Sequence, residues 1–210
     1  RLRGRDLEVM IQDIAPGREI YAFYAYYHRK SEPLALCGYD KIRQQEPDFG
    51  SCSCCKSLWR PEAARTALQL LRDMGYHGLA EPEFKKDPRD GEYKLIEINA
   101  RTTLLNRLPA ACGVDIEYAA YLDCIGREPD VSARPRDGVL WVDDFADQKS
   151  FLTHLKRRDL SRSEIVDSFK LRKVHSVAAW DAPLPFVIRL ARALCAGIRR
   201  VLPHRAGSRS

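Results

Sequence analysis

Charged and amide side chains recur at every second position near the end of the run EYKLIEINAR, residues 92–101. Alternate side chains of a β-strand point to the same face, so we expect Glu97, Asn99 and Arg101 to share one face. Glu83 lies in the preceding apolar run, and an even-sum antiparallel register across the turn KDPRDG would place it on that face too. Carboxylate and amide oxygens are ligands that suit Mg²⁺. The pattern therefore predicts an oxygen-rich metal site.

Burial of an unpaired carboxylate is costly, so Glu97 needs a neighbouring cation or a shifted pKa. Arg101, at the end of the row, could hold a phosphate or a carboxylate in a bidentate grip. The alternative is a hairpin edge whose acids are solvated or paired with Lys94 and nearby arginines. Spacing alone leaves both interpretations open.

Hydrophobic periodicity predicts the elements that must position these side chains. Strands are predicted over residues 7–14, 19–27, 34–43, 78–84 and 92–101, with a shorter strand within 138–145. Helices are predicted over 61–74, 115–125, 147–158 and 184–202. The first three strands are expected to form an antiparallel meander, and 78–84 with 92–101 a hairpin. The expected fold class is α+β, with an antiparallel sheet flanked by helices.

Composition limits the class of protein. The chain has 210 residues, of which 45% are hydrophobic and 30% charged, as in a globular protein. An uninterrupted apolar run of about 18 residues is absent, and the opening RLRGRDLEV lacks the core of a signal peptide. Seven cysteines, an odd number, favour reduced thiols. We therefore expect a cytoplasmic protein. The net charge of +6 comes with no nucleic-acid-binding motif, so no nucleic-acid partner is expected.

The segment EFKKDPRDGEYKLIEINAR, residues 83–101, resembles the metal-binding hairpin of the ATP-grasp superfamily of ATP-dependent carboxylate–amine ligases. VMIQDIAPGRE, residues 9–19, resembles the hinge between the two nucleotide-gripping halves of that fold. DKIRQQEPDFG, residues 40–50, resembles a later strand and loop with a basic residue aimed at the transferring phosphate. The resemblance implies the C-terminal half of an ATP-grasp domain in residues 1–130 and a small C-terminal extension in residues 131–210.

The resemblance also implies roles for individual residues. Mg²⁺ (or Mn²⁺) would be held by Glu83, Glu97 and Asn99. Lys41, Arg43 and Arg101 would lie at the phosphate and acyl end as catalytic residues. The ATP-binding residues would be Gln12, Asp13, Ile14 and Ala15 at the adenine edge, Glu19 at the ribose, and Lys85 with its stem under the ring.

The activity implied is activation of a small-molecule carboxylate as an acyl phosphate, which a small-molecule amine then attacks. The sequence names neither substrate. Because the chain begins almost at the hinge, the upstream half of the grasp is missing from it, and we interpret the chain as a fragment. Two alternatives stay open: the other half lies on another chain, or the protein is a non-catalytic nucleotide-binding or partner-binding module. The intact acidic row argues against the last.

Two further features allow two interpretations each. The run SCSCCK carries Cys52, Cys54 and Cys55, which could suggest zinc, but no second cysteine pair matches it, so free thiols in a loop over residues 44–57 are expected. The basic amphipathic helix at 184–202 could dock on its own domain or make peripheral contact with an anionic membrane.

Overall fold

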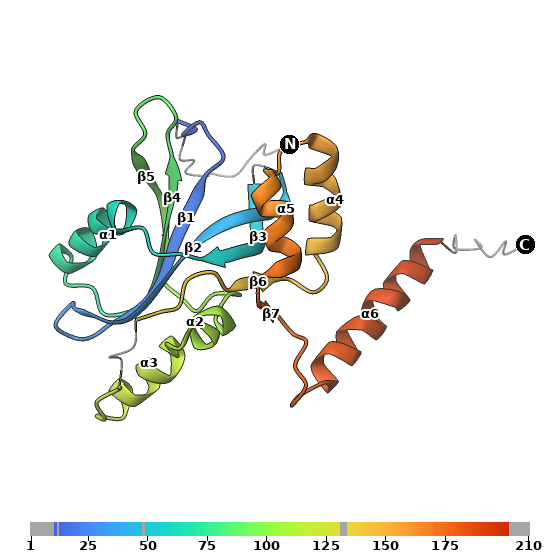
Figure 1. Ribbon diagram of the computed structural model, residues 1–210. Coiled ribbons are helices and arrows are strands. Elements are labelled where there is room, and N and C mark those ends of the chain that lie inside the picture. The colour runs from blue at the N-terminus through green and yellow to red at the C-terminus, as the bar shows by residue number, and fades with distance from the viewer. Residues whose placement is uncertain (1–10, 12, 48, 131–133, 202–210) are drawn as a thin grey trace, which may run out of the picture.

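The computed structural model describes residues 11, 13–47, 49–130 and 134–201. Within them, seven strands form one sheet flanked by six helices, so the fold is α+β, as predicted (Figure 1). The strands are β1 (Ile20–Tyr27), β2 (Pro33–Glu46), β3 (Phe49–Ser57), β4 (Gly78–Lys86), β5 (Tyr93–Asn99), β6 (Leu140–Val142) and β7 (Lys173–His175). The helices are α1 (Pro61–Asp73), α2 (Arg107–Cys112), α3 (Ile116–Cys124), α4 (Asp147–Arg157), α5 (Arg162–Lys170) and α6 (Leu184–Val201).

The strand order of the sheet is β5-β4-β1-β2-β3-β6-β7. Every pairing is antiparallel except that of β6 with β7. Of the meander predicted over residues 7–14, 19–27 and 34–43, the last two strands appear as the antiparallel pair β1 and β2, whereas β3, which pairs with β2, was not predicted. The predicted hairpin is β4 with β5. Of the strand predicted over residues 7–14, positions 11, 13 and 14 belong to no strand, and the other positions lie outside the described residues.

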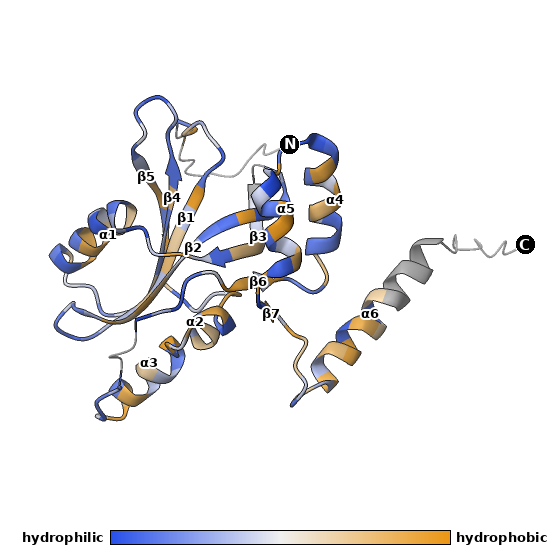
Figure 2. Cartoon of the chain, in the orientation of Figure 1, coloured by the Kyte–Doolittle hydropathy of each residue, from blue (hydrophilic) through white to orange (hydrophobic). Residues whose placement is uncertain are grey.

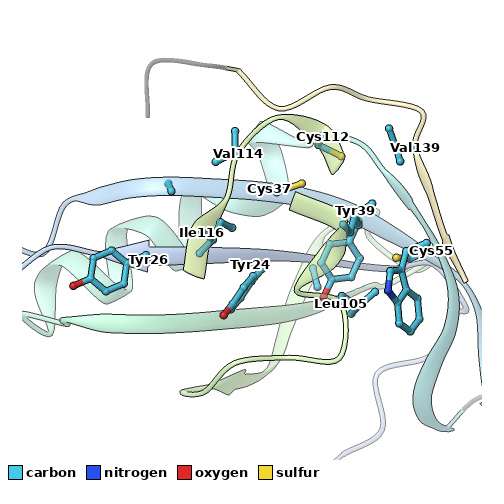
Figure 3. Close-up of a cluster of buried hydrophobic side chains, with 14 of the residues drawn as sticks. Tyr24, Tyr26, Cys37, Tyr39, Cys55, Leu105, Cys112, Val114, Ile116 and Val139 are labelled. Carbon is cyan, nitrogen blue, oxygen red and sulfur yellow. The ribbon is translucent and has the colours of Figure 1, made fainter. Parts of the chain in front are cut away.

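Central strand β1 is buried on both faces because it lies between β2 and β4 with helices on either side of the sheet. Tyr24 and Tyr26 on one face pack with side chains from α2 and α3, in the cluster drawn in Figure 3. Tyr21 and Phe23 on the other face pack with the alanine-rich side of α1. The aromatic run that marked this strand in the sequence thus supplies two cores.

The prediction of a cysteine-bearing loop over residues 44–57 is wrong, because β2 continues to Glu46 and β3 starts at Phe49. Cys52, Cys54 and Cys55 are buried free thiols on β3. Serines and cysteines, small and able to pack, serve here as the interior strand residues that Val or Ile usually provide. A strand of this composition lacks the β-branched signal on which the sequence pattern relies.

The C-terminal third extends the same sheet. The predicted strand and helices there appear as β6, α4 and α6, whereas α5 and β7 were not predicted. Figure 1 shows α6 standing away from the rest of the molecule, and Figure 2 shows apolar residues along it. Among the described residues, no helix combines the length and the apolar character needed to cross a bilayer.

We expect the α1 core to be sensitive to loss of side-chain volume. Leu71 on α1 is 1% exposed, so Leu71→Ala should lower the free energy of unfolding by about 2–5 kcal/mol. Leu152→Ala on α4 removes the same atoms at a position 56% exposed and should cost about 0.5 kcal/mol or less. Urea denaturation of the two variants measures the difference. Equal losses would contradict the packing described for α1.

Candidate functional site

A cavity of about 860 Å³ opens at the end of the sheet where β1 and β5 begin and extends along β5 to Asn99, a size usual for small-molecule sites. Its walls come from β1, β2, β3, β4 and β5 and from residues 13–15 and 103–105. Most of the predicted site residues line it: Asp13, Ile14, Ala15, Lys41, Glu83, Lys85, Glu97, Asn99 and Arg101. Side chains distant in sequence are therefore gathered around one space.

The β4–β5 register brings the acidic residues together. Glu83 lies opposite Glu97, and Glu81 lies opposite Asn99, which is the register expected from the sequence. A β-bulge between Glu83 and Phe84 interrupts the alternation along β5. Tyr93, four positions before Glu97, would share its face in a regular strand. It instead packs in the α1 core, with its ring centroid 6.2 Å from that of Tyr21.

Lys41 on β2 reaches across β1 to Glu83 on β4. Its ammonium Nζ lies 2.5 Å from Glu83 Oε2, and the two side chains are only 8% and 10% exposed. Burial alone would lower the pKa of Lys41, but the negative charge of Glu83 and its hydrogen bond reverse this, and the net pKa is raised. Lys41 therefore stays a cation at the wall of the cavity.

Glu81 belongs to the same cluster and was missed in the sequence analysis. Its carboxylate accepts a hydrogen bond from the Tyr39 hydroxyl and a longer one, 3.4 Å, from Asn99 Nδ2. Burial raises the pKa of Glu81, although the bond from Tyr39 and the charge of Lys41 act the other way. The period of two along β4 could have found this residue, because Glu81 is two positions before Glu83.

The remaining members of the row are more open. Asn99 Nδ2 donates to Glu97 Oε1 at 2.9 Å, and an Arg101 guanidinium nitrogen donates to Asn99 Oδ1 at 3.1 Å. Glu97 and Arg101 are exposed. The cavity thus has a buried, neutralised end at Lys41 and Glu83 and an accessible end at Glu97 and Arg101.

Arg43, predicted to act beside Lys41, is not among the residues that line this cavity. The register between β2 and β3 shifts between Lys41 and Arg43, and this bulge turns the two side chains to different faces. Arg43 is instead buried against the other face, where it donates to both carboxylate oxygens of Asp147 at 2.8 Å and to the Ser168 hydroxyl at 2.8 Å. It fastens α4 and α5 to the sheet.

One predicted nucleotide contact, Glu19, is not among the residues that line the cavity. Glu19 alternates with Ile20, so its side chain points away; it is largely exposed and lies 3.5 Å from the ammonium of Lys86. Gln12 lies outside the described residues. Of the predicted hinge, Asp13, Ile14 and Ala15 reach the cavity, as does Lys85 from β4.

The donor chemistry fits a magnesium ion held together with phosphate. Among the described residues, no three His, Cys, Asp or Glu side chains are already grouped as a metal cage. Mg²⁺ does not need one, because it usually keeps several waters and binds through one or two carboxylates plus substrate phosphates. Glu83 and Glu97, opposite each other on neighbouring strands, supply that number of carboxylates.

The chain is similar over 102 residues to the D-aspartate ligase of Enterococcus faecium (strain Aus0004), at 30% identity. The match covers 47% of this chain, and the chain spans about a quarter (24%) of that curated relative. No family model matches. The partial match agrees in class with the resemblance to ATP-dependent carboxylate–amine ligases noted in the sequence.

Solved ATP-grasp structures resemble the chain only in part. The biotin carboxylase domain of Hydrogenobacter thermophilus 2-oxoglutarate carboxylase, solved with MgADP and bicarbonate, is 19% identical with a TM-score of 0.44, over 58% of this chain and 28% of that one. The L-amino acid ligase of Bacillus licheniformis is 14% identical with a TM-score of 0.40, over 56% and 33% of the two chains. Likenesses this low assign no substrate and no residue role to this chain.

Arg43→Ala separates the structural position of Arg43 from the predicted catalytic one. The substitution leaves the Asp147 carboxylate without its buried partner and should cost about 3–5 kcal/mol of unfolding free energy. Removing both groups in Arg43→Ala/Asp147→Ala should cost less than the single substitution. Lys149→Ala, which breaks the exposed pair of Lys149 with Glu46, serves as the control and should cost about 0–1 kcal/mol. A stable Arg43→Ala protein would refute the buried clamp.

Proposed function

We propose that this chain is part of an enzyme that uses ATP and Mg²⁺ to ligate a small-molecule carboxylate to an amine through an acyl phosphate. One observation carries the proposal: two opposed carboxylates, Glu83 and Glu97, lie with Asn99 and the cations Lys41 and Arg101 around a single cavity. The partial match to a D-aspartate ligase supports the ligase class. Because the chain spans a quarter of that relative, the activity is proposed for the whole protein.

In this proposal Glu83, Glu97 and the amide oxygen of Asn99 hold the metal. When bound, ATP would supply the transferable phosphoryl group, and magnesium would neutralise the charge on its oxygens. Arg101, exposed at the cavity mouth and already bonded to Asn99 Oδ1, is placed to hold the carboxylate or the phosphate in a bidentate grip. Asp13, Ile14 and Ala15, which line the cavity, would hold the adenine edge, and the stem of Lys85 would cover the ring.

Lys41 has a second part in this scheme. Before ligands bind, its ammonium neutralises Glu83 at 2.5 Å. A divalent cation at Glu83 would repel that ammonium, and a phosphate oxygen nearby would attract it. Lys41 is therefore proposed to exchange Glu83 for the transferring phosphoryl group, which places a positive charge where negative charge develops.

The division of the chain at residue 130 and a cytoplasmic location belong to the same proposal. Every residue named for the site lies before residue 130, in support of a nucleotide-binding part and a C-terminal extension. The six cysteines whose side chains the structure describes are free thiols, which is usual for proteins of a reducing compartment.

Calorimetric titration with Mg²⁺ and a non-hydrolysable ATP analogue tests the metal row. Glu97→Gln keeps the shape of the side chain but removes a metal-binding charge, so it should weaken metal-dependent binding tenfold or more, about 1.4 kcal/mol. Glu92→Gln makes the same change at an exposed position that does not line the cavity, and it should bind like the unsubstituted chain.

Equal affinities for Glu97→Gln and the unsubstituted chain would contradict the metal assignment. Tight, metal-dependent binding by this chain, with no ligase activity once the upstream sequence is restored, would instead favour the non-catalytic nucleotide-binding module.

A further inference from the structure

Helix α6 contacts the rest of the protein through its first turns. The Phe186 ring lies 5.5 Å from the ring of Phe145, and the Arg189 guanidinium lies 4.9 Å from the same ring. From Leu184 to position 193, Phe186 is the one residue that is not exposed. Beyond this anchor the helix extends away from the sheet, as Figure 1 shows. The anchor therefore fixes which side of α6 faces the protein.

The opposite side of α6 is apolar and faces solvent. Leu184, Val187 and Ile188 are 65%, 55% and 44% exposed. Their spacing of three and four residues places them on one helix face, away from Phe186 and Arg189. Figure 2 shows this apolar character on a helix that no other element covers. Trp180, just before the helix, is fully exposed as well.

The charges of α6 are of one sign. Its sequence contains Arg189, Arg192, Arg199 and Arg200 and no acidic residue. Arg192 is exposed and lies beside the apolar face at helical spacing. A helix with one apolar face, arginines at its side and an exposed tryptophan nearby is suited to the interface of an anionic bilayer, where the apolar face enters the acyl region.

We propose that α6 lies in the plane of an anionic lipid surface and attaches the protein to it. Charge complementarity favours this occupant over a second copy of the chain. Pairing of two α6 helices through their apolar faces would bring two sets of arginines together without a compensating acid on either helix. Lipid phosphates and carboxylates compensate them directly. The attachment is independent of the ligase proposal, because none of these residues lines the cavity.

Vesicle flotation with the 210-residue chain tests the attachment. Binding is expected to vesicles of phosphatidylcholine mixed with phosphatidylserine, to be much weaker to phosphatidylcholine alone, and to fall as salt rises. Val187→Asp places a charge on the apolar face and should weaken binding about tenfold or more. Leu152→Asp, which makes an equivalent change at an exposed position of α4, should bind as the unsubstituted chain does.

Arg192→Gln should reduce binding to the anionic vesicles and flatten its dependence on salt, while Val187→Asp should weaken it at every salt concentration. Light scattering of the same samples reports association of the chain with itself. Failure of the unsubstituted chain to float with anionic vesicles would overturn the proposal. So would equal flotation of Val187→Asp, or a dimer in solution that Val187→Asp abolishes while no vesicle binding is seen.

Discussion

The burial of charged side chains on β2 and β4, on either side of β1, is the constraint on which this structure depends. Glu81 and Glu83 lie almost without solvent on β4, and neither would be tolerated there alone. Both partners come from β2 and reach across β1. The Lys41 ammonium neutralises Glu83, and the Tyr39 hydroxyl donates a hydrogen bond to Glu81. Side chains of β2 and β4 can meet across β1 because the pairing registers place Ala22 of β1 opposite both Tyr39 and Glu83. A small side chain at that position leaves room for the polar groups to converge.

Irregularities of the sheet decide which side chains reach the cavity. A bulge on β2 separates Lys41, which reaches it, from Arg43, which instead fastens α4 and α5 through Asp147. A second bulge, between β4 and β5, sends Tyr93 into the α1 core and leaves Glu97 and Asn99 on the open face. The two bulges thus direct Arg43 to α4 and α5 and Tyr93 to the α1 core, close to the polar row. The arrangement is consistent with a site held rigid at one end and open at the other.

Local periodicity allowed the strands, the main helices and the Glu83–Glu97 register to be predicted, because each depends on side chains near in sequence. The faces of Arg43 and Tyr93 could not be predicted in this way, since a bulge adds one residue and leaves no mark in the composition. Strand β3 was missed because serine and cysteine carry little β signal. Glu81 could have been found by extending the alternation of β4 by one step. Which face of α6 is exposed could be identified only from the contact of Phe186 with Phe145, which lies far from the helix in sequence.

The central claim is that Lys41 is paired with the Glu83 carboxylate until a metal ion binds Glu83 and a nucleotide phosphate attracts Lys41. Titration of Mn²⁺ followed by electron paramagnetic resonance tests this claim most directly. Lys41→Met frees the Glu83 carboxylate of its cation. The account predicts tighter Mn²⁺ binding than in the unsubstituted chain when nucleotide is absent, and a smaller gain in Mn²⁺ affinity when the non-hydrolysable ATP analogue is added. Glu83→Gln should weaken Mn²⁺ binding under both conditions. Mn²⁺ affinities that are the same in the unsubstituted chain, Lys41→Met and Glu83→Gln would contradict the account.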